Sequence, residues 1–374
     1  MANWFNKLSG SSKFSLFRKD NSVIGIDFGS SSIKVIQLKN DKGRAVLETY
    51  GELSTGPYGG LTVGQAVTLS SDKLGYLLND LFGEANVTTR RGAISIPLRS
   101  SLLVPIKLPE LPGAKLEEMI PIEARKYIPV PISEVELDWW VVPKNDLHNE
   151  IADGDKKVTP AMLEVFIAAI HKDTLRQYEE VSRQAKIETR FFEIETFSAM
   201  RSVLQDNLNT VVIVDIGAGT TKMVVVDRGT IKLSHTISKG AQDVTLAISR
   251  SMNVTFAKAE EIKRKVGLAE KIGADDLAVI ASPTVEYIFS EVSRIMLDYQ
   301  KEHNRSIDKV LLIGGGALLK GIMEVAKENI YTPVEFGSPF SRVEAPAFLD
   351  KVLMEIGPSF AVSIGLALRA LEEL

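Results

Sequence analysis

Two short turn segments of the chain carry the same kinds of side chain in the same order. The first presents Asp27, Gly29, Ser30, Ser31, Ser32 and Lys34, and the second presents Asp215, Gly217, Gly219, Thr220 and Thr221. Backbone N–H groups and hydroxyls in such turns bind phosphate oxygens, and a nearby lysine adds a cation. Either turn alone reads as an ordinary β-turn with an aspartate. Because the two recur in register with a repeated strand pattern, they predict a clamp that grips one polyphosphate from opposite lobes.

The aspartates that open the two turns suit a magnesium site. Mg²⁺ keeps several of its waters and takes few protein carboxylates, so we expect Asp27 and Asp215 to hold Mg²⁺ through water. A carboxylate that orders these waters can also orient an attacking water molecule. Both aspartates are therefore candidate catalytic residues.

A third segment, rich in glycine, completes the predicted site. Gly314, Gly315 and Gly316 follow a buried strand and precede a helix, a setting that lets a nucleoside lie against bare backbone. The other common phosphate motifs, G-x-x-x-x-G-K-[ST] and a G-x-G-x-x-G that opens a helix after a strand, do not occur. The three segments together predict an ATP-binding cleft.

The elements that position these turns follow a repeated order. Residues 22–52 read as strand, tight turn, strand, Asp-Lys-Gly turn and strand, and residues 210–240 repeat this order with an Arg-Gly turn. Helical spacing is found at 64–83, 241–267 and 283–303, a buried strand is expected at 91–98, and a polar hairpin loop is expected at 144–160. The repeat predicts a duplicated α/β architecture with two lobes.

We divide the chain into six parts on this pattern. They are a flexible N-terminal tail (1–21), the first part of lobe I (22–98), an inserted subdomain (99–164), the second part of lobe I (165–209), lobe II (210–350, with a helical subdomain at about 241–305) and a C-terminal helix returning to lobe I (351–374).

Composition excludes several classes of protein. The 374 residues are 45% hydrophobic and 25% charged, which is enough material for two cores, and the net charge of −4 argues against a nucleic-acid partner. The chain has no cysteine and its four histidines lack ligand spacing, as expected in a reducing compartment. We find neither a signal peptide nor a continuous apolar stretch of membrane-spanning length, so we expect a cytoplasmic protein. The first twenty residues mix aromatic and basic side chains and read either as a frayed tail or as a segment that rests on an anionic membrane.

The motifs resemble those of a known superfamily. IGIDFGSSSIK and VDIGAGTTK resemble the two phosphate motifs of the actin, Hsp70 and hexokinase superfamily, and LLIGGGALLKGI resembles its adenosine motif. The resemblance spans residues 22–374, and the inserted subdomain resembles that of the FtsA branch. EARKYIPVPISEVELDW and EIGPSFAVSIGLALRALE resemble the PilM family of type IV pilus assembly proteins. This implies an actin-like (ribonuclease H-like duplicated) two-lobed ATPase fold with an FtsA-type insertion.

The resemblance also implies partners and a location. Such a protein binds ATP at the inner face of the cell membrane and docks onto the cytoplasmic N-terminal segment of the inner-membrane protein PilN. It thereby links the inner-membrane complex to the assembly ATPase and the platform protein, and homo-oligomer formation stays open. We place the peptide groove between the inserted subdomain and lobe I, near residues 125–131, with Tyr127 as its test residue; the alternative is that Pro129 and Pro131 merely end a helix and start an edge strand.

Three further residues take their roles from the resemblance. Glu260 and Lys263 carry over as nucleoside contacts, with a solvated helical face as the alternative. Glu195 lies where Hsp70-like proteins place a catalytic carboxylate, with a cap carboxylate as the alternative. Ala218 replaces an acidic residue of actin, so we expect at most slow ATP hydrolysis.

Other functions remain open at this stage. An FtsA-like division filament would carry a C-terminal linker and an amphipathic helix, whereas this sequence stops at Leu374 after a packed helix. A sugar kinase would need a substrate pocket with a base aspartate, which we do not find. A secretion or DNA-uptake counterpart of the pilus protein cannot be separated from it by sequence.

Overall fold

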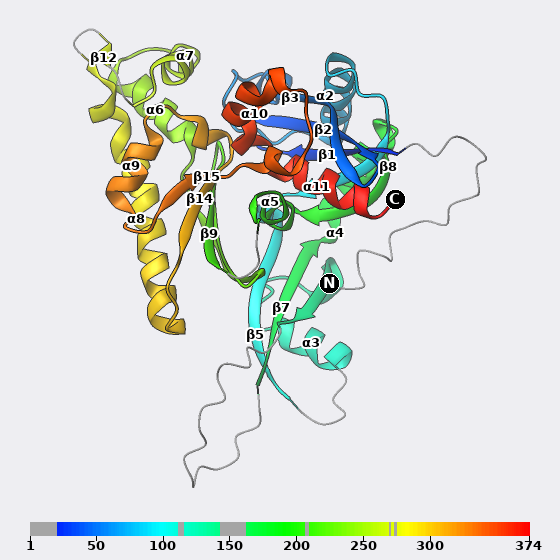
Figure 1. The fold of residues 1–374 in the computed structure, drawn as a ribbon. Coiled ribbons are helices and arrows are strands. Elements are labelled where there is room, and N and C mark those ends of the chain that lie inside the picture. The colour runs from blue at the N-terminus through cyan, green and yellow to red at the C-terminus, as the bar shows by residue number, and fades with distance from the viewer. Residues whose placement is uncertain (1–20, 111–115, 143–161, 206–208, 269–270, 273–274) are drawn as a thin grey trace. The chain divides into compact units, whose positions relative to one another are not determined.

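The computed structural model describes residues 21–110, 116–142, 162–205, 209–268, 271–272 and 275–374. These residues form two compact units. We call residues 98–177 the inserted unit, and residues 21–97 with 178–374 the main unit (Figure 1). The expected N-terminal tail and the hairpin loop at 144–160 lie outside the described residues.

The first sheet of the main unit contains the first predicted turn. Its strands are β1 (Ser22–Phe28), β2 (Ser32–Asp41), β3 (Arg44–Ser54), β4 (Arg91–Ile96) and β8 (Glu188–Ile194), in the order β3-β2-β1-β4-β8. β1, β2 and β3 are antiparallel, and β4 and β8 continue the sheet in parallel with β1. Lys42 and Gly43 close the β2–β3 hairpin with φ angles of 53° and 83°, which is why a glycine stands there.

The second sheet repeats this topology. Its strands are β9 (Thr210–Ile216), β10 (Thr221–Asp227), β11 (Thr230–Ile237), β14 (Lys309–Ile313) and β15 (Val334–Phe336), in the order β11-β10-β9-β14-β15. The first three strands are again antiparallel and the last two parallel to β9. The duplication expected from the sequence is therefore confirmed strand by strand.

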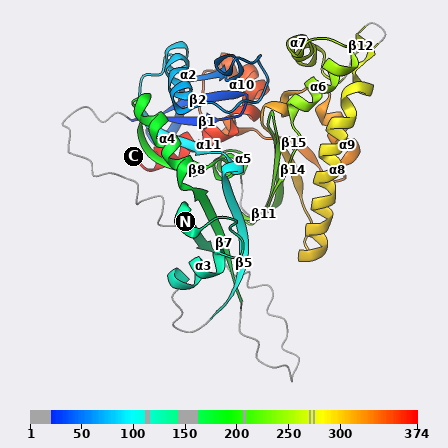
Figure 2. The same cartoon turned by 180° about the vertical axis from the view of Figure 1, so that it is seen from behind.

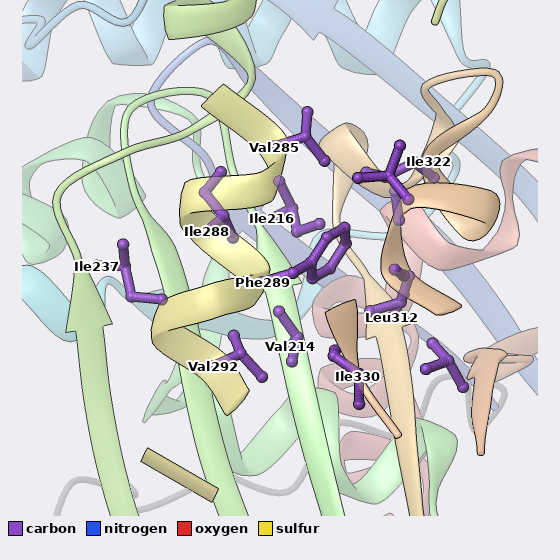
Figure 3. Close-up of a cluster of buried hydrophobic side chains, with 14 of the residues drawn as sticks. Val214, Ile216, Ile237, Val285, Ile288, Phe289, Val292, Leu312, Ile322 and Ile330 are labelled. Carbon is purple, nitrogen blue, oxygen red and sulfur yellow. The ribbon is translucent and has the colours of Figure 1, made fainter. Parts of the chain in front are cut away.

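Helices cover the two sheets (Figures 1 and 2). The main unit contains α2 (Ser71–Glu84), α5 (Glu195–Val203), α6 (Ala241–Ser251), α7 (Phe256–Val266), α8 (Leu277–His303), α9 (Ile322–Asn329), α10 (Asp350–Ile356) and α11 (Ala361–Glu372), while α4 (Lys172–Gln184) crosses the unit boundary and β12 (Lys271–Ile272) pairs with β13 (Asp275–Asp276). Figure 3 shows Phe289 of α8 among apolar side chains of the second sheet, including Val214 and Leu312. This buried cluster holds α8 and α9 against the sheet.

The C-terminal helix α11 packs onto the first sheet at backbone distance. A Cβ at Gly25 of β1 would overlap the carbonyl oxygen of Ser363, and a Cβ at Gly365 would overlap that of Ser198 in α5. The span Ala347–Glu372 is apolar enough by composition to cross a membrane, with a mean hydropathy of 1.4, yet 67% of that window is buried in the fold. Close packing against β1 and α5 accounts for its small, apolar residues.

The inserted unit has a sheet of its own. β5 (Ser101–Pro109), β7 (Met162–His171) and β6 (Val135–Val141) form an antiparallel sheet in the order β5-β7-β6, and α3 (Leu116–Ala124) packs on it. The sequence-based division placed residues 165–171 in lobe I, but β7 pairs along its whole length with β5 and β6. The six buried apolar residues of β7, 165–170, would suit the core of either sheet, so the sequence alone did not distinguish the two sheets.

Four features of the helices also differ from expectation. The predicted helix at 64–83 begins only at Ser71, and residues 64–70 form a loop. Leu69 in this loop is buried, as a residue in the core face of a helix would be. The segment 241–267 splits into α6 and α7, and α8 starts six residues before the expected 283. The triple glycine leads into a short 3₁₀ turn, Gly315–Leu318, so it does not open α9 directly.

Candidate functional site

A cavity of about 410 Å³ lies in the main unit between the two predicted turns. Its size is within the range of small-molecule sites, roughly 300–1,000 Å³. The predicted residues that line it are Asp27, Gly29, Ser30, Ser31, Ser32, Lys34, Glu195, Asp215, Gly217, Thr220, Glu260, Lys263, Gly314, Gly315 and Gly316. The fold thus gathers segments from both sheets and from the helical subdomain around one space.

Two predicted residues do not line this cavity. Thr221 is fully buried, and its hydroxyl donates a hydrogen bond to the carbonyl oxygen of Lys239 at 2.9 Å. Because side chains alternate along a strand, the cavity takes Thr220 and Lys222 from this part of the chain and Thr221 points away. Gly219 likewise lies outside the lining.

In the first turn, Asp27 lies directly opposite Lys34 on the neighbouring strand. The Asp27 carboxylate accepts a hydrogen bond from the Ser95 hydroxyl at 3.1 Å, and that hydroxyl accepts one from the N–H of Phe28 at 3.0 Å. Burial raises the pKa of the Asp27 carboxyl to about 6, although the Lys34 cation works to lower the pKa. The Lys34 ammonium donates to Ser32 at 2.9 Å and forms an ion pair with Glu52 at 3.2 Å.

The backbone of the first turn is held from outside by residues 55–67. Thr55 donates hydrogen bonds to the carbonyls of Ser30 and Ser31, each at 3.0 Å, and the N–H of Val67 donates to the Ser30 carbonyl at 2.9 Å. A Cβ at Gly29 would lie 2.6 Å from the Ser32 carbonyl oxygen, so the tight turn requires glycine there. These contacts fix the peptide units that face the cavity.

The second turn contains a charged residue that the sequence reasoning missed. Lys222 lies opposite Asp215, as Lys34 lies opposite Asp27, and each lysine follows its aspartate by the same offset. The Lys222 ammonium is 2.7 Å from a Glu195 carboxylate oxygen and 3.2 Å from one of Asp215. Burial alone would lower the pKa of Lys222, but the Asp215 and Glu195 carboxylates outweigh burial and raise the pKa. The matching offset in the repeat was the signal that could have identified Lys222.

Glu195 is the first residue of α5 and is only 5% exposed. A carboxylate in the first turn of a helix is stabilised by the helix dipole, which is the cap-type role considered above. The same side chain also lines the cavity and contacts Lys222. Its position therefore allows both interpretations.

Glu260 and Lys263 form a buried cluster rather than a solvated helical face. They are 5% and 8% exposed, and their charged groups are 2.7 Å apart. Thr245 donates to Glu260 at 2.7 Å, and Arg264 approaches the same carboxylate at 2.7 Å. Burial opposes ionisation, but Lys263 and the hydrogen bonds lower the pKa of Glu260. Gly64 of lobe I lies against this carboxylate, where a Cβ would come within 2.5 Å of its carbon.

The three glycines at 314–316 differ in what they do. A Cβ at Gly314 would overlap the Asp215 carboxylate, and a Cβ at Gly316 would overlap the Ile216 side chain. Both glycines therefore allow close packing against β9, and Gly314 also has a φ of 86°. Gly315 has open space around its Cβ position, so it is the member of the three that offers bare backbone to a ligand.

The acidic residues of the cavity suit a metal ion that is bound through its water ligands. In the part of the chain that the structure describes, no group of three His, Cys, Asp or Glu side chains is arranged to hold a metal directly. Asp27, Asp215 and Glu195 nevertheless line the same cavity. This arrangement suits Mg²⁺ bound through water and phosphate oxygens better than a bare ion in a protein cage.

Comparison with protein families gives a match over nearly the whole chain. The profile of the family described as "Type IV pilus assembly protein PilM" matches residues 25–371. The cell division protein FtsA of Helicobacter pylori (strain J99 / ATCC 700824) is 27% identical over 235 residues, which cover 55% of this chain and 47% of that protein. FtsA of Pseudomonas aeruginosa is 23% identical over 394 residues, which cover 94% of this chain and 89% of that protein. The chain spans about half the length of the Helicobacter relatives it matches.

Solved structures show the same fold. A PilM-PilN type IV pilus biogenesis complex superimposes with a TM-score of 0.77 at 24% identity, covering 93% of this chain and 98% of that chain. The ethanolamine utilization protein EutJ from Carboxydothermus hydrogenoformans has a TM-score of 0.55 at 17% identity, covering 93% and 89%. The actin-like fold expected from the sequence is confirmed.

Proposed function

The chain belongs to the PilM family of type IV pilus assembly proteins, and on that premise we propose that it is an ATP-binding adaptor of the pilus assembly machinery. The observation that carries the nucleotide half of this proposal is the single cavity lined by both phosphate turns and by Gly315. Its lining includes five carboxylates (Asp27, Glu52, Glu195, Asp215, Glu260) and four cations (Lys34, Lys222, Lys263, Arg264). An accompanying Mg²⁺ offsets the excess of carboxylates that a polyphosphate meets in such a cavity, which supports Mg-ATP as the ligand.

We assign roles to the lining residues as follows. The turn residues Ser30, Ser31 and Thr220 bind phosphate oxygens, and Glu260 and Lys263 contact the nucleoside. Asp27 and Asp215 orient the waters of Mg²⁺, and Glu195 orients an attacking water. The metal, when bound, supplies charge neutralisation of the phosphates. Because Ala218 offers no carboxylate at the second turn, we expect slow hydrolysis, so that occupancy rather than turnover is the signal.

Calorimetric titration with ATP and excess Mg²⁺ tests the nucleotide half. We expect saturable binding by the full chain, weakened about 10-fold or more by Lys34→Ala, since hydrogen bonds to charged groups contribute about 1.5–3 kcal/mol. Lys301→Ala is the matched control, because Lys301 is an exposed lysine on α8. Absence of nucleotide binding by the wild-type chain would refute this half.

The partner half of the proposal is docking onto the N-terminal cytoplasmic segment of a PilN-like inner-membrane protein. The inserted unit exposes Ile122 (64%) and Tyr127 (43%) on and just after α3. Exposed apolar and aromatic side chains of this kind anchor peptide segments. Through this contact the protein would sit at the cytoplasmic face of the inner membrane and connect to the assembly ATPase and platform protein.

Titration with that peptide, with and without Mg-ATP, tests the partner half. We expect saturable binding, reduced about 10-fold or more by Tyr127→Ala. Tyr76→Ala is the matched control, because Tyr76 is 71% exposed on α2 of the main unit. Equal losses for both variants would remove Tyr127 from the docking surface, and no binding in either nucleotide state would refute docking.

A second candidate function is a division-type filament. It is favoured by the similarity to FtsA of Pseudomonas aeruginosa over 94% of the chain. Sedimentation with and without Mg-ATP separates the two, because a filament protein pellets with nucleotide and an adaptor stays in the supernatant.

A further inference from the structure

The duplicated turns are not electrostatically equivalent. In the first, the lysine is paired away from the turn's aspartate: Lys34 contacts Glu52, while Asp27 accepts a hydrogen bond from Ser95. In the second, Lys222 contacts its own aspartate, Asp215, and also Glu195. The two copies of one motif therefore distribute their positive charge differently around the cavity.

Lys222 bridges the two carboxylates that hydrolysis would use. Its ammonium lies between Asp215 at the end of β9 and Glu195 at the start of α5, and all three side chains line the cavity. The Lys222 side chain is 18% exposed, and those of Glu195 and Asp215 are 6% and 16% exposed. In such a buried setting the ammonium interacts with both carboxylates more strongly than it would in water.

The Lys222 ammonium could do what a divalent cation would otherwise do at this site. Two carboxylates in one cavity repel each other and repel an incoming polyphosphate, unless a cation lies between them. Mg²⁺ performs this task in sites whose carboxylates are otherwise uncompensated. Here the Lys222 ammonium already contacts two of the three carboxylates, Asp27, Asp215 and Glu195, that line the cavity between the turns.

We propose that Lys222 is a built-in counter-cation of the nucleotide site, which lets the protein bind nucleotide with little dependence on Mg²⁺. This inference rests on the proposed nucleotide-binding function. Lys222 acts through the two carboxylates, so it is a positioning residue.

The test is the affinity for ADP measured by calorimetry in excess Mg²⁺ and, separately, in EDTA. For the wild-type chain we expect the two dissociation constants to agree within about 10-fold. Lys222→Gln should weaken binding in EDTA by about 10- to 100-fold, since a charged hydrogen bond is worth about 1.5–3 kcal/mol, and by less than about 3-fold in Mg²⁺. Lys222→Arg should rescue binding in EDTA.

Two further variants separate this role from a structural one. Lys239→Gln is the control, because Lys239 pairs with Asp243 in the first turn of α6 and does not line the cavity. If Lys222→Gln does not fold, as judged by its thermal melt, the double variant Lys222→Gln/Glu195→Gln removes the uncompensated charge. The double variant should again bind ADP in EDTA about as well as the wild type.

Each outcome decides a different point. If Lys222→Gln weakens ADP binding equally in Mg²⁺ and in EDTA, Lys222 acts as a direct phosphate contact or as a structural residue. That result overturns the inference. Wild-type binding that occurs only with Mg²⁺ overturns the inference and leaves the proposed function standing. No wild-type binding in either condition overturns both.

Discussion

Among single residues, Asp27 illustrates how a functional group opposes stability. Asp27 is 8% exposed, and burial raises the pKa of its carboxyl to about 6 from an ordinary value of 3.8. A raised pKa means that the folded state binds the proton more tightly than the unfolded state does. The associated stability is fully present below about pH 4 and is lost as the pH rises through about 6.

The substitution Asp27→Asn should therefore stabilise the ligand-free protein at pH 8. We expect the free energy of unfolding to rise by up to about 3 kcal/mol at pH 8, and the difference to vanish near pH 4, where Asp27 is protonated. Urea unfolding in metal-free buffer at both pH values measures this. Asp41→Asn, at an exposed position, is the control and should change stability by less than about 0.5 kcal/mol. A stabilisation that is the same at both pH values would contradict the electrostatic account.

Gly60 and Gly64 provide a second residue-level test. Both have positive φ angles, 74° and 89°, but only Gly64 lies against the Glu260 carboxylate. Gly60→Ala should cost about 1 kcal/mol of stability from backbone strain alone. Gly64→Ala should cost more and should also weaken nucleotide binding several-fold, because the new Cβ displaces Glu260. Thermal melts and nucleotide titrations of the two variants measure these effects. An equal loss of nucleotide affinity in both variants would contradict the role of Gly64.

The sequence could predict the residues at which the chain itself repeats a pattern. Asp27, Asp215 and the hydroxyl residues stand in matching order, so their convergence on one cavity, Thr221 excepted, was foreseeable. The pairing of Lys222 with Glu195 was not, because it joins residues from different elements and depends on where α5 begins. The burial of Glu260 and Lys263 likewise depends on another element, α6. Thr245 of α6 donates a hydrogen bond to Glu260, and Lys263 donates to Thr245 and to the carbonyl oxygen of Ala241.

Among elements, α11 depends most clearly on close packing. Gly25 and Gly365 allow its backbone to approach β1 and α5, so a methyl group at either position has no space. Gly365→Ala should therefore destabilise the protein by about 1–3 kcal/mol, despite the better helix propensity of alanine.

Gly83→Ala is the matched control for Gly365→Ala. Gly83 is also a helical glycine, but no atom lies within 4 Å of its Cβ position. Alanine should there raise stability by about 0.5–1 kcal/mol. Midpoints of urea unfolding measure both effects, and a destabilisation of the same size in both variants would show that packing is not the cause.

The order of the three antiparallel strands in each sheet was predictable, whereas the membership of β7 was not. The repeat of strand, turn, strand, turn and strand fixed the antiparallel halves of both sheets. β7 is buried along most of its length and carries no alternation that would identify its sheet, and only pairing with β5 and β6 decides it. The helix predicted from residue 64 failed because Leu69 is buried in a loop and imitates helical spacing.

For the whole molecule, the two proposed ligands should protect different units. The nucleotide cavity lies within the main unit, and Tyr127 belongs to the inserted unit. Mg-ATP should slow amide hydrogen exchange in residues 28–32, 217–221 and 314–316, and the PilN-type peptide should slow exchange after α3. Protection of the inserted unit by nucleotide alone would instead reveal coupling between the units.

Any such coupling must be reciprocal. If Mg-ATP changes the affinity for the peptide by some factor, the peptide changes the affinity for Mg-ATP by the same factor. Titrating each ligand in the presence of saturating amounts of the other measures both factors. Unequal factors would mean that a further equilibrium, such as self-association, is involved.

The way the inserted unit joins the main unit has a mechanical consequence. The chain leaves the first sheet at the end of β4 and enters the inserted unit at Leu98. β4 is an interior strand, with β1 on one side and β8 on the other, both parallel to it. Tension along β4 loads the hydrogen bonds of both neighbours in shear, so they resist together, whereas an edge strand can be peeled away one bond at a time. Force that reaches the main unit along β4 would therefore be shared by β1 and β8, while the second connection between the units runs through α4.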